Sequence, residues 1–124
     1  QAVLSGKYLP GKKPPAGSRA TDKKSGAAMI SRWMNDEILR EVAKLEPIAQ
    51  DCGLTMAQLA VAWVLQNSNV SSAIIGASKA KQVKENVKAA GVKLSSDVMK
   101  AIDDAIGRIA ERDPAKDVSP NPRP

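Results

Sequence analysis

The spacing of apolar residues predicts four helices and one strand in this chain. The first helix is expected over residues 35–51, because apolar side chains recur there every three or four positions and Gly53 follows as a stop. Pro47 lies inside this pattern, and a proline within a helix removes a hydrogen bond and crowds the preceding turn. We therefore expect this helix to be kinked or split. The apolar positions on its inner face are Ile38, Val42, Leu45 and Ala49.

The second helix begins at a clear local signal. Thr55 and Gln58 match a capping box, in which each side chain bonds the backbone N–H of the other residue, and the helix should run to about residue 67. Residues 59–65 are apolar on every side of this helix. A helix without a polar face is expected to be buried on several sides.

The third and fourth helices follow the one segment that has the pattern of a strand. Residues 70–75 are rich in β-branched side chains and lie between polar residues. Ser78 is the expected N-cap of the third helix, which should end at Gly91, and either Ser95 or Ser96 should cap the fourth. The side chains expected to face inward are Val83, Val87 and Ala90, then Val98, Ile102, Ala105, Ile106 and Ile109.

A single buried strand makes an incomplete fold. The backbone groups of residues 70–75 need neighbours on both edges. Either those neighbours come from sequence outside this chain, or copies of the chain exchange elements, or the segment is not a strand. The helix–strand–helix order is typical of the last units of a β/α barrel, and a complete barrel needs about 250 residues. We therefore expect an α/β protein that is the C-terminal piece of a (β/α)8 TIM barrel, mostly helical with about one parallel strand.

The first 30 residues differ from the rest in composition and charge. Glycine and proline are frequent in residues 1–30, which predicts a long ordered loop or a flexible arm. Six basic residues face Asp22 alone near this end of a chain with net charge +6. Such a segment attracts phosphate on a nucleotide, a nucleic acid or a lipid, unless it is simply a solvated basic loop. Residues 31–112 would hold the helices and the strand, and residues 113–124 a proline-rich extended tail.

Residue counts narrow the class of protein further. Cys52 is the only cysteine, so a disulfide framework is excluded and a reducing, cytoplasmic location is expected. No apolar run is long enough to predict a membrane-spanning helix. The sequence has no histidine, and no group of residues has metal-ligand spacing, so no metal site is expected.

Three stretches agree with one another in order and separation. They are residues 4–8 (Leu-Ser-Gly-Lys-Tyr) with 14–19 (Pro-Pro-Ala-Gly-Ser-Arg), residues 59–63 (Leu-Ala-Val-Ala-Trp), and Gly76-Ala-Ser78 with Gln82, Glu85 and Asn86. In these motifs the chain resembles the aldo-keto reductase superfamily, within it the branch of voltage-gated potassium channel β subunits and bacterial aldo/keto reductases. The resemblance implies a (β/α)8 barrel that binds NADP(H) at the C-terminal ends of its strands. It also implies that residues 72–75 are the last strand and residues 79–90 the final barrel helix.

The resemblance implies cofactor-binding roles for residues on the long loop and around the strand end. Lys7 and Arg19 would clamp the phosphates of the cofactor from the loop. Ser78 would present its hydroxyl and N–H to the adenosine 2′-phosphate, where the positive end of the helix also helps. Gly76 would allow the ribose phosphate to approach the backbone closely.

Three positions on the third helix complete the implied cofactor path. Gln82 would flank the 2′-phosphate or the adenine, and Glu85 and Asn86 would hydrogen-bond the adenine amino group. Many members of the family have an arginine where Gln82 stands, so the preference for NADP would depend more on Ser78 and the loop cations. Taken singly, these residues also suit a helix cap, a solvated helix face and ordinary loop charges.

The resemblance implies an activity whose catalytic residues are not in this sequence. The family reduces aldehydes and ketones by hydride transfer from NADPH, with a tetrad of Tyr, Lys, Asp and His. Tyr8 is the only tyrosine and belongs to the cofactor loop, so no catalytic residue is assigned and this piece alone is expected to be inactive. The expected partner is a small carbonyl substrate, without nucleic acid or membrane, and the oligomeric state stays open, a homo-oligomer included.

Two other functions remain open on the sequence. One is a non-catalytic cofactor-sensing or interaction subunit, as the likeness to channel β subunits permits. The other, with less support, is a basic nucleic-acid-binding domain, because no aromatic platform for stacking bases accompanies the basic loop.

Overall fold

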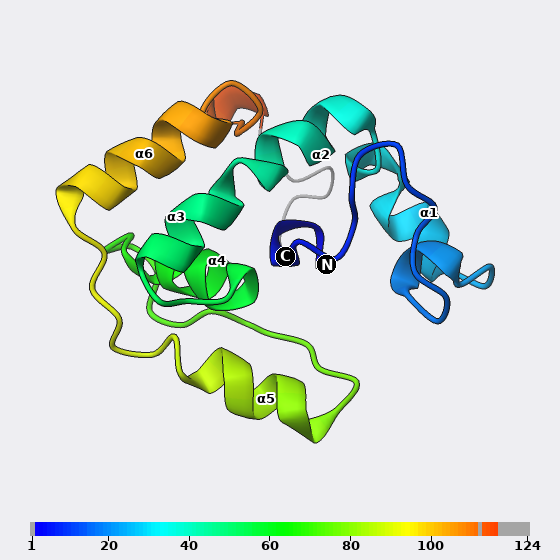
Figure 1. The fold of residues 1–124 in the computed structure, drawn as a ribbon, viewed down its shortest axis with the longest axis horizontal. Coiled ribbons are helices and arrows are strands. Elements are labelled where there is room, and N and C mark those ends of the chain that lie inside the picture. Colours follow the sequence, from blue (N-terminus) through cyan, green and yellow to red (C-terminus); the bar gives the residue numbers. More distant parts are fainter. Residues whose placement is uncertain (1, 112, 117–124) are drawn as a thin grey trace.

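The computed structural model describes residues 2–111 and 113–116, and this part of the chain is helical (Figure 1). Its α-helices, in chain order, are α1 (Gly26–Ile30), α2 (Asp36–Ala43), α3 (Leu45–Asp51), α4 (Met56–Leu65), α5 (Ala80–Val87) and α6 (Ser96–Ile106). Short 3-10 helices are η1 (Val3–Ser5), η2 (Arg19–Thr21), η3 (Ser31–Trp33) and η4 (Pro114–Lys116). Figure 1 shows α3, α4 and α6 close together, with α5 and the N-terminal arm extending away on different sides.

The first expected helix is split in two. α2 ends at Ala43 and α3 begins at Leu45, with Lys44 between them. Pro47 has no N–H to donate to the carbonyl of Ala43, four residues earlier, and its ring crowds that carbonyl. The break therefore falls one turn before the proline, which confirms the split that the sequence predicted.

Hydroxyl caps set the starts of α4 and α6. At α4, Thr55 Oγ1 accepts the Gln58 N–H at 3.2 Å, and Gln58 Oε1 accepts the Thr55 N–H at 3.0 Å. This is the reciprocal capping box expected from the sequence. At α6, Ser95 Oγ accepts the Val98 N–H at 3.2 Å, so Ser95 rather than its neighbour is the N-cap.

The main core lies between α3, α4 and α6. Its buried side chains are Leu45, Ala49, Leu59, Ile102, Ala105 and Ile106. Burying a Leu or Ile contributes about 1.5–3 kcal/mol relative to leaving it exposed. α4 is less enclosed than its apolar sequence predicted, because Leu59 and Ala62 are buried whereas Val64 is 37% exposed.

The strand expected over residues 70–75, or 72–75 by resemblance, does not form, and that prediction is wrong for this structure. The segment connects α4 to α5 as irregular chain, and no strand occurs within residues 2–111 and 113–116. Ile74 is 100% exposed, and Ile75 is 40% exposed. A lone segment cannot complete the hydrogen bonds of its backbone without a neighbouring strand, so the β-branched pattern has nothing to pair with.

Helix α5 is also shorter and more exposed than expected. Val83 is 44% exposed and Val87 is 59% exposed, so these two side chains do not face inward as the sequence predicted. Ala90 is exposed as well, whereas Ala89 is buried. The chain does turn at Gly91, which adopts a φ of 78°, as expected for a residue that follows a helix.

The N-terminal arm is an ordered loop, one of the two forms that the sequence allowed. Two of its turns place glycine where φ must be positive, Gly11 at 67° and Gly17 at 70°. They are closed by the Lys12 N–H to the Leu9 carbonyl and by the Ser18 N–H to a carbonyl three residues earlier. These bonds give the arm a defined path without long helices.

The arm is held to the helices by a second apolar cluster. Tyr8 and Ile30 are buried against Leu39 of α2, with Ala20 and Met34 packed around them.

The sequence pattern did not predict α1, because a helix this short has no periodicity to read.

Two further expectations concern membrane-spanning helices and the proline-rich tail. No helix among them is by itself long and apolar enough to span a membrane, and Asp36–Asp51 with Met56–Leu65 pass by length and composition only as a pair bent by 90°. Most of the expected proline-rich tail, residues 117–124, lies outside the described residues.

Candidate functional site

The start of α5 is organised around the side chain of Gln82. Its Oε1 accepts the Ser78 N–H at 2.8 Å, the Lys79 N–H at 3.1 Å and the Ser78 hydroxyl at 3.2 Å. Lys79, not Ser78, stands at the N-cap position, so the predicted serine cap is wrong. The physical reason is reach: the Gln82 amide extends back over one helical turn and accepts the N–H groups of Ser78 and Lys79, and the helix begins only after Lys79.

This arrangement creates a position where one oxygen receives three hydrogen bonds. Two donors are backbone N–H groups at the positive end of a helix, and the third is the Ser78 hydroxyl. The same donors suit an oxygen of a phosphate or carboxylate. Gly76 lies just before them, and nothing lies within 4 Å of the place that a Cβ would take there. The described residues therefore do not themselves require glycine at this position.

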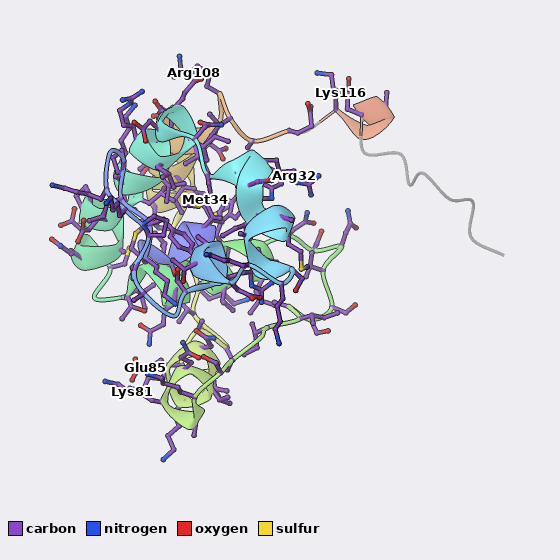
Figure 2. The ribbon with its side chains drawn as sticks, turned by 90° about the vertical axis from the view of Figure 1, so that its right-hand side faces the viewer. Arg32, Met34, Lys81, Glu85, Arg108 and Lys116 are labelled. Carbon is purple, nitrogen blue, oxygen red and sulfur yellow. The ribbon has the colours of Figure 1, made fainter. Side chains whose placement is uncertain are left out.

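The next turn of α5 is tied to α4. Gln58 Nε2 donates to the Glu85 carbonyl at 3.0 Å and to Glu85 Oε2 at 3.3 Å. The other carboxylate oxygen of Glu85 pairs with Lys88 at 3.4 Å. Asn86 is half-buried, and its side-chain amide has no hydrogen-bond partner in the part of the chain that the structure describes. Figure 2 shows Glu85 on α5, which stands apart from the rest of the molecule.

The two loop cations of the expected cofactor path lie elsewhere. Lys7 and Arg19 are both exposed. Arg19 begins η2, which packs against α1, whereas α5 packs against α4. Figure 1 shows the arm and α5 on different sides of the molecule. The structure thus brings Ser78, Gln82, Glu85 and Asn86 together along one segment and does not bring Lys7 and Arg19 to them.

Two residues to which the sequence analysis gave no role in the site shape these two regions. Gln58 is buried and links α4 to α5, and its only sequence signal was its place in the capping box. Asp22 organises the turn beside Arg19 by accepting the N–H groups of Lys24 at 3.0 Å and Gly26 at 3.1 Å. These backbone hydrogen bonds, chiefly the one from Lys24, hold the pKa of Asp22 below its ordinary value.

The described residues contain no group of three or more His, Cys, Asp and Glu side chains that could hold a metal ion.

Comparisons with known proteins identify the relatives of the chain. The sequence model of the Aldo/keto reductase family matches residues 1–106. A probable voltage-gated potassium channel subunit beta of Arabidopsis thaliana is 44% identical over 90 residues, which cover 73% of this chain and 27% of that protein. The protein of the same description from Oryza sativa subsp. japonica has the same identity and coverage.

A third relative extends the match along the chain. The putative voltage-gated potassium channel subunit beta of Schizosaccharomyces pombe is 40% identical over 107 residues, 84% of this chain and 30% of that protein. The chain thus spans less than a third of the length of these relatives. It belongs to the aldo/keto reductase family, whose fold is the (β/α)8 barrel.

Proposed function

We propose that this chain is the C-terminal, NADP(H)-binding part of an aldo-keto reductase that reduces aldehyde or ketone carbonyls by hydride transfer. The observation that carries the proposal is the convergence of the Ser78 N–H, the Ser78 hydroxyl and the Lys79 N–H on one oxygen. An oxygen of the adenosine 2′-phosphate would take the place that Gln82 Oε1 occupies, and the positive helix end would stabilise its charge. The glutamine side chain would then turn outward beside the phosphate.

The other assigned residues fit the cofactor to different degrees. Asn86 offers a free amide to the adenine, whereas both carboxylate oxygens of Glu85 already have partners. Lys7 and Arg19 would reach the phosphates only after the arm and α5 approach each other. In the proposal, barrel strands from sequence outside this chain hold the two regions in place, and Gly76 then passes close to the ribose phosphate.

The chemistry of the proposed reaction comes from the bound nicotinamide, which supplies the hydride. The residues of this chain would bind and orient the adenosine end of the cofactor, and none of them is assigned a catalytic role. The Tyr8 hydroxyl is buried, with the residue only 2% exposed, so it does not offer a proton to a substrate at the surface. A small carbonyl compound, with no nucleic acid or membrane, is the proposed partner of the whole enzyme, and its proposed location is the cytoplasm.

Calorimetric titration of this chain with NADPH and with NADH tests the proposal. We expect saturable binding that favours NADPH, because only NADPH carries the 2′-phosphate. Ser78→Ala should reduce this preference, whereas Arg19→Gln should change it little in this chain, because the arm lies apart from α5. Lys24→Gln is the matched control, because Lys24 is an arm cation outside the assigned set. Equal affinity for the two cofactors, or no binding, would contradict the proposal that these donors hold the 2′-phosphate.

A second candidate function is a cofactor-sensing or interaction subunit without catalysis. The names of the relatives favour it, because each is described as a channel subunit. A change of circular dichroism or thermal midpoint that differs between NADPH and NADP⁺ would support sensing. Oxidation of NADPH by this chain in the presence of an aldehyde would contradict both this candidate and the expectation that the piece alone is inactive.

A further inference from the structure

A hollow of about 390 Å³ lies between the N-terminal arm and the α1–α2 region. This volume is within the range of small-molecule sites, about 300–1,000 Å³. Its apolar lining includes Met34, Ala20 of η2 and Leu39 of α2. Met34, labelled in Figure 2, packs against the cluster that contains Tyr8 of the arm. None of the seven residues assigned to the cofactor lines this hollow, so a ligand bound here would be independent of the proposed function.

Two opposite charges line the same hollow without pairing. Lys12 and Asp36 are both lining residues, and neither forms an ion pair within residues 2–111 and 113–116. The Gly11 N–H donates to Asp36 Oδ1 at 3.0 Å, which orients the carboxylate and anchors the arm to α2. Asp36 is also the first residue of α2, where the positive helix end favours a negative charge.

A buried hydroxyl beside the apolar lining has no partner. Tyr8 packs with Leu39, Ala20 and Met34, which line the hollow, and its hydroxyl has no hydrogen-bond partner among the described residues. A buried donor left without a partner is unfavourable, and native structures usually satisfy such groups with a ligand, water or a neighbouring polar atom. Because the hydroxyl is itself buried and Tyr8 does not line the hollow, it would make no direct contact with a ligand there.

We propose that this hollow binds a small zwitterion with an aliphatic body. Its carboxylate would pair with Lys12, its ammonium group would pair with Asp36, and its methylene groups would lie over Met34 and Leu39. A simple anion would meet the Asp36 carboxylate, and a simple cation would meet the Lys12 ammonium. A molecule that carries both charges, separated by an apolar chain, matches the whole lining.

Titration of the full 124-residue chain with 6-aminohexanoate, followed by amide chemical shifts in nuclear magnetic resonance, tests the proposal. Hexanoate and hexylamine are the matched probes, because each keeps the chain and removes one charge. We expect 6-aminohexanoate to bind about fivefold more tightly than either, the value of one partly exposed ion pair near 1 kcal/mol. The shifts should centre on Lys12, Ser31 and Met34.

Charge-removing variants sharpen the test. Lys12→Gln should bring the affinity for 6-aminohexanoate down to that for hexylamine, and Asp36→Asn should bring it down to that for hexanoate. Lys13→Gln is the control, because that neighbouring lysine does not line the hollow. If Asp36→Asn fails to fold by circular dichroism, the ranking of the three probes on the unmodified chain still decides. Equal affinity of the three probes, no saturation, or shifts centred outside the hollow would overturn the proposal.

Discussion

The core of α3, α4 and α6 and the segment that contains α5 use the same residue types and reach opposite outcomes. Leu59 and Ile102 are 2% and 1% exposed in the core, whereas Ile74 and Val87 are 100% and 59% exposed in the segment. The core helices supply apolar surface to one another. The segment before α5 has no described strand beside it, and α5 itself is covered mainly by α4.

The difference shows that burial depends on which surfaces the chain can bring together. An apolar side chain at a helical or strand position becomes buried only when a second element packs against it. In this chain other helices pack against Ile102, whereas Ile74 remains exposed. The residues assigned to the cofactor lie mostly in the second region, which explains why the described residues hold only part of the expected site.

Removing a core side chain should give the largest effect. Ile102→Ala should lower the free energy of unfolding by about 2–5 kcal/mol, because it opens a cavity in the core as well as losing buried surface. The matched change Val87→Ala on α5 should stay within about 0.5 kcal/mol, as for most exposed positions. Urea unfolding followed by circular dichroism measures both. Equal losses in the two variants would mean that α5 is packed as tightly as the core.

The link between the two regions should give the next largest effect. Gln58→Ala removes the side-chain half of the capping box, in which Gln58 Oε1 accepts the Thr55 N–H, and both hydrogen bonds to Glu85, so we expect a loss of about 1–3 kcal/mol. Amide hydrogen exchange should also accelerate in α5 more than in α6. Gln50→Ala, an exposed position in α3, is the control. Unchanged exchange in α5 would show that the Gln58–Glu85 contact does not hold this helix in place.

The two helix starts should respond differently to loss of a hydroxyl. Thr55→Ala should destabilise the protein by about 1 kcal/mol, since it removes the cap of α4. Ser78→Ala should change the free energy of unfolding by only about a few tenths of a kcal/mol, because Gln82 Oε1 keeps the N–H groups of Ser78 and Lys79 satisfied. Gln82→Ala should be the more damaging change at α5. Thermal unfolding of the three variants is the measurement. A larger effect of Ser78→Ala than of Gln82→Ala would show that Ser78 caps α5 after all.

The smallest effect should come from the ion cluster that joins α2 to the turn after α6. Glu41 pairs with Lys44 at 2.7 Å and with Arg108 at 3.2 Å, and these contacts, first the hydrogen bond from Lys44, hold the pKa of Glu41 below its ordinary value of 4.5. Figure 2 labels Arg108 at the edge of the molecule. Since both cations are more than half exposed, the stabilisation is modest.

The sign of the pH dependence follows from that shift. A lowered pKa in the folded state stabilises the protein above the unfolded value of 4.5, and this contribution is lost as the pH falls through the folded pKa. The urea midpoint of the unmodified chain should therefore fall at acid pH, and Glu41→Gln should flatten part of the fall. Glu46→Gln is the control, because Glu46 is an exposed carboxylate in α3. An identical acid profile for Glu41→Gln would contradict the assignment.

Prediction from sequence succeeded where the signal and its partner are both local. The capping box at Thr55, the cap at Ser95 and the split before Pro47 each involve groups within four residues, so the neighbours are present in any structure the chain adopts. The cap at Ser78 failed although it is also local. Gln82 Oε1 accepts the N–H groups of Ser78 and Lys79, so α5 begins one residue later than a cap at Ser78 would place it, and residue preferences alone do not predict this.

The candidate site was predictable only as a set of residues, through family resemblance. Ser78, Gln82, Glu85 and Asn86 lie on one segment, as their spacing along the chain requires. Whether Lys7 and Arg19 join them depends on contacts across the barrel, and the described residues leave them apart. Their cofactor roles stay predictions.

The sequence by itself determined the helices of the core, most of their ends and the membership of the aldo/keto reductase family. Caps, prolines and apolar periodicity act over one or two turns, so they need no distant partner. Only the tertiary structure decided that residues 70–75 remain unpaired, that Gln82 rather than Ser78 closes the start of α5, and that Lys12 and Asp36 line one hollow. Each of these outcomes depends on which surfaces and donors meet in space, and strand pairing above all requires a second strand that a local pattern cannot supply.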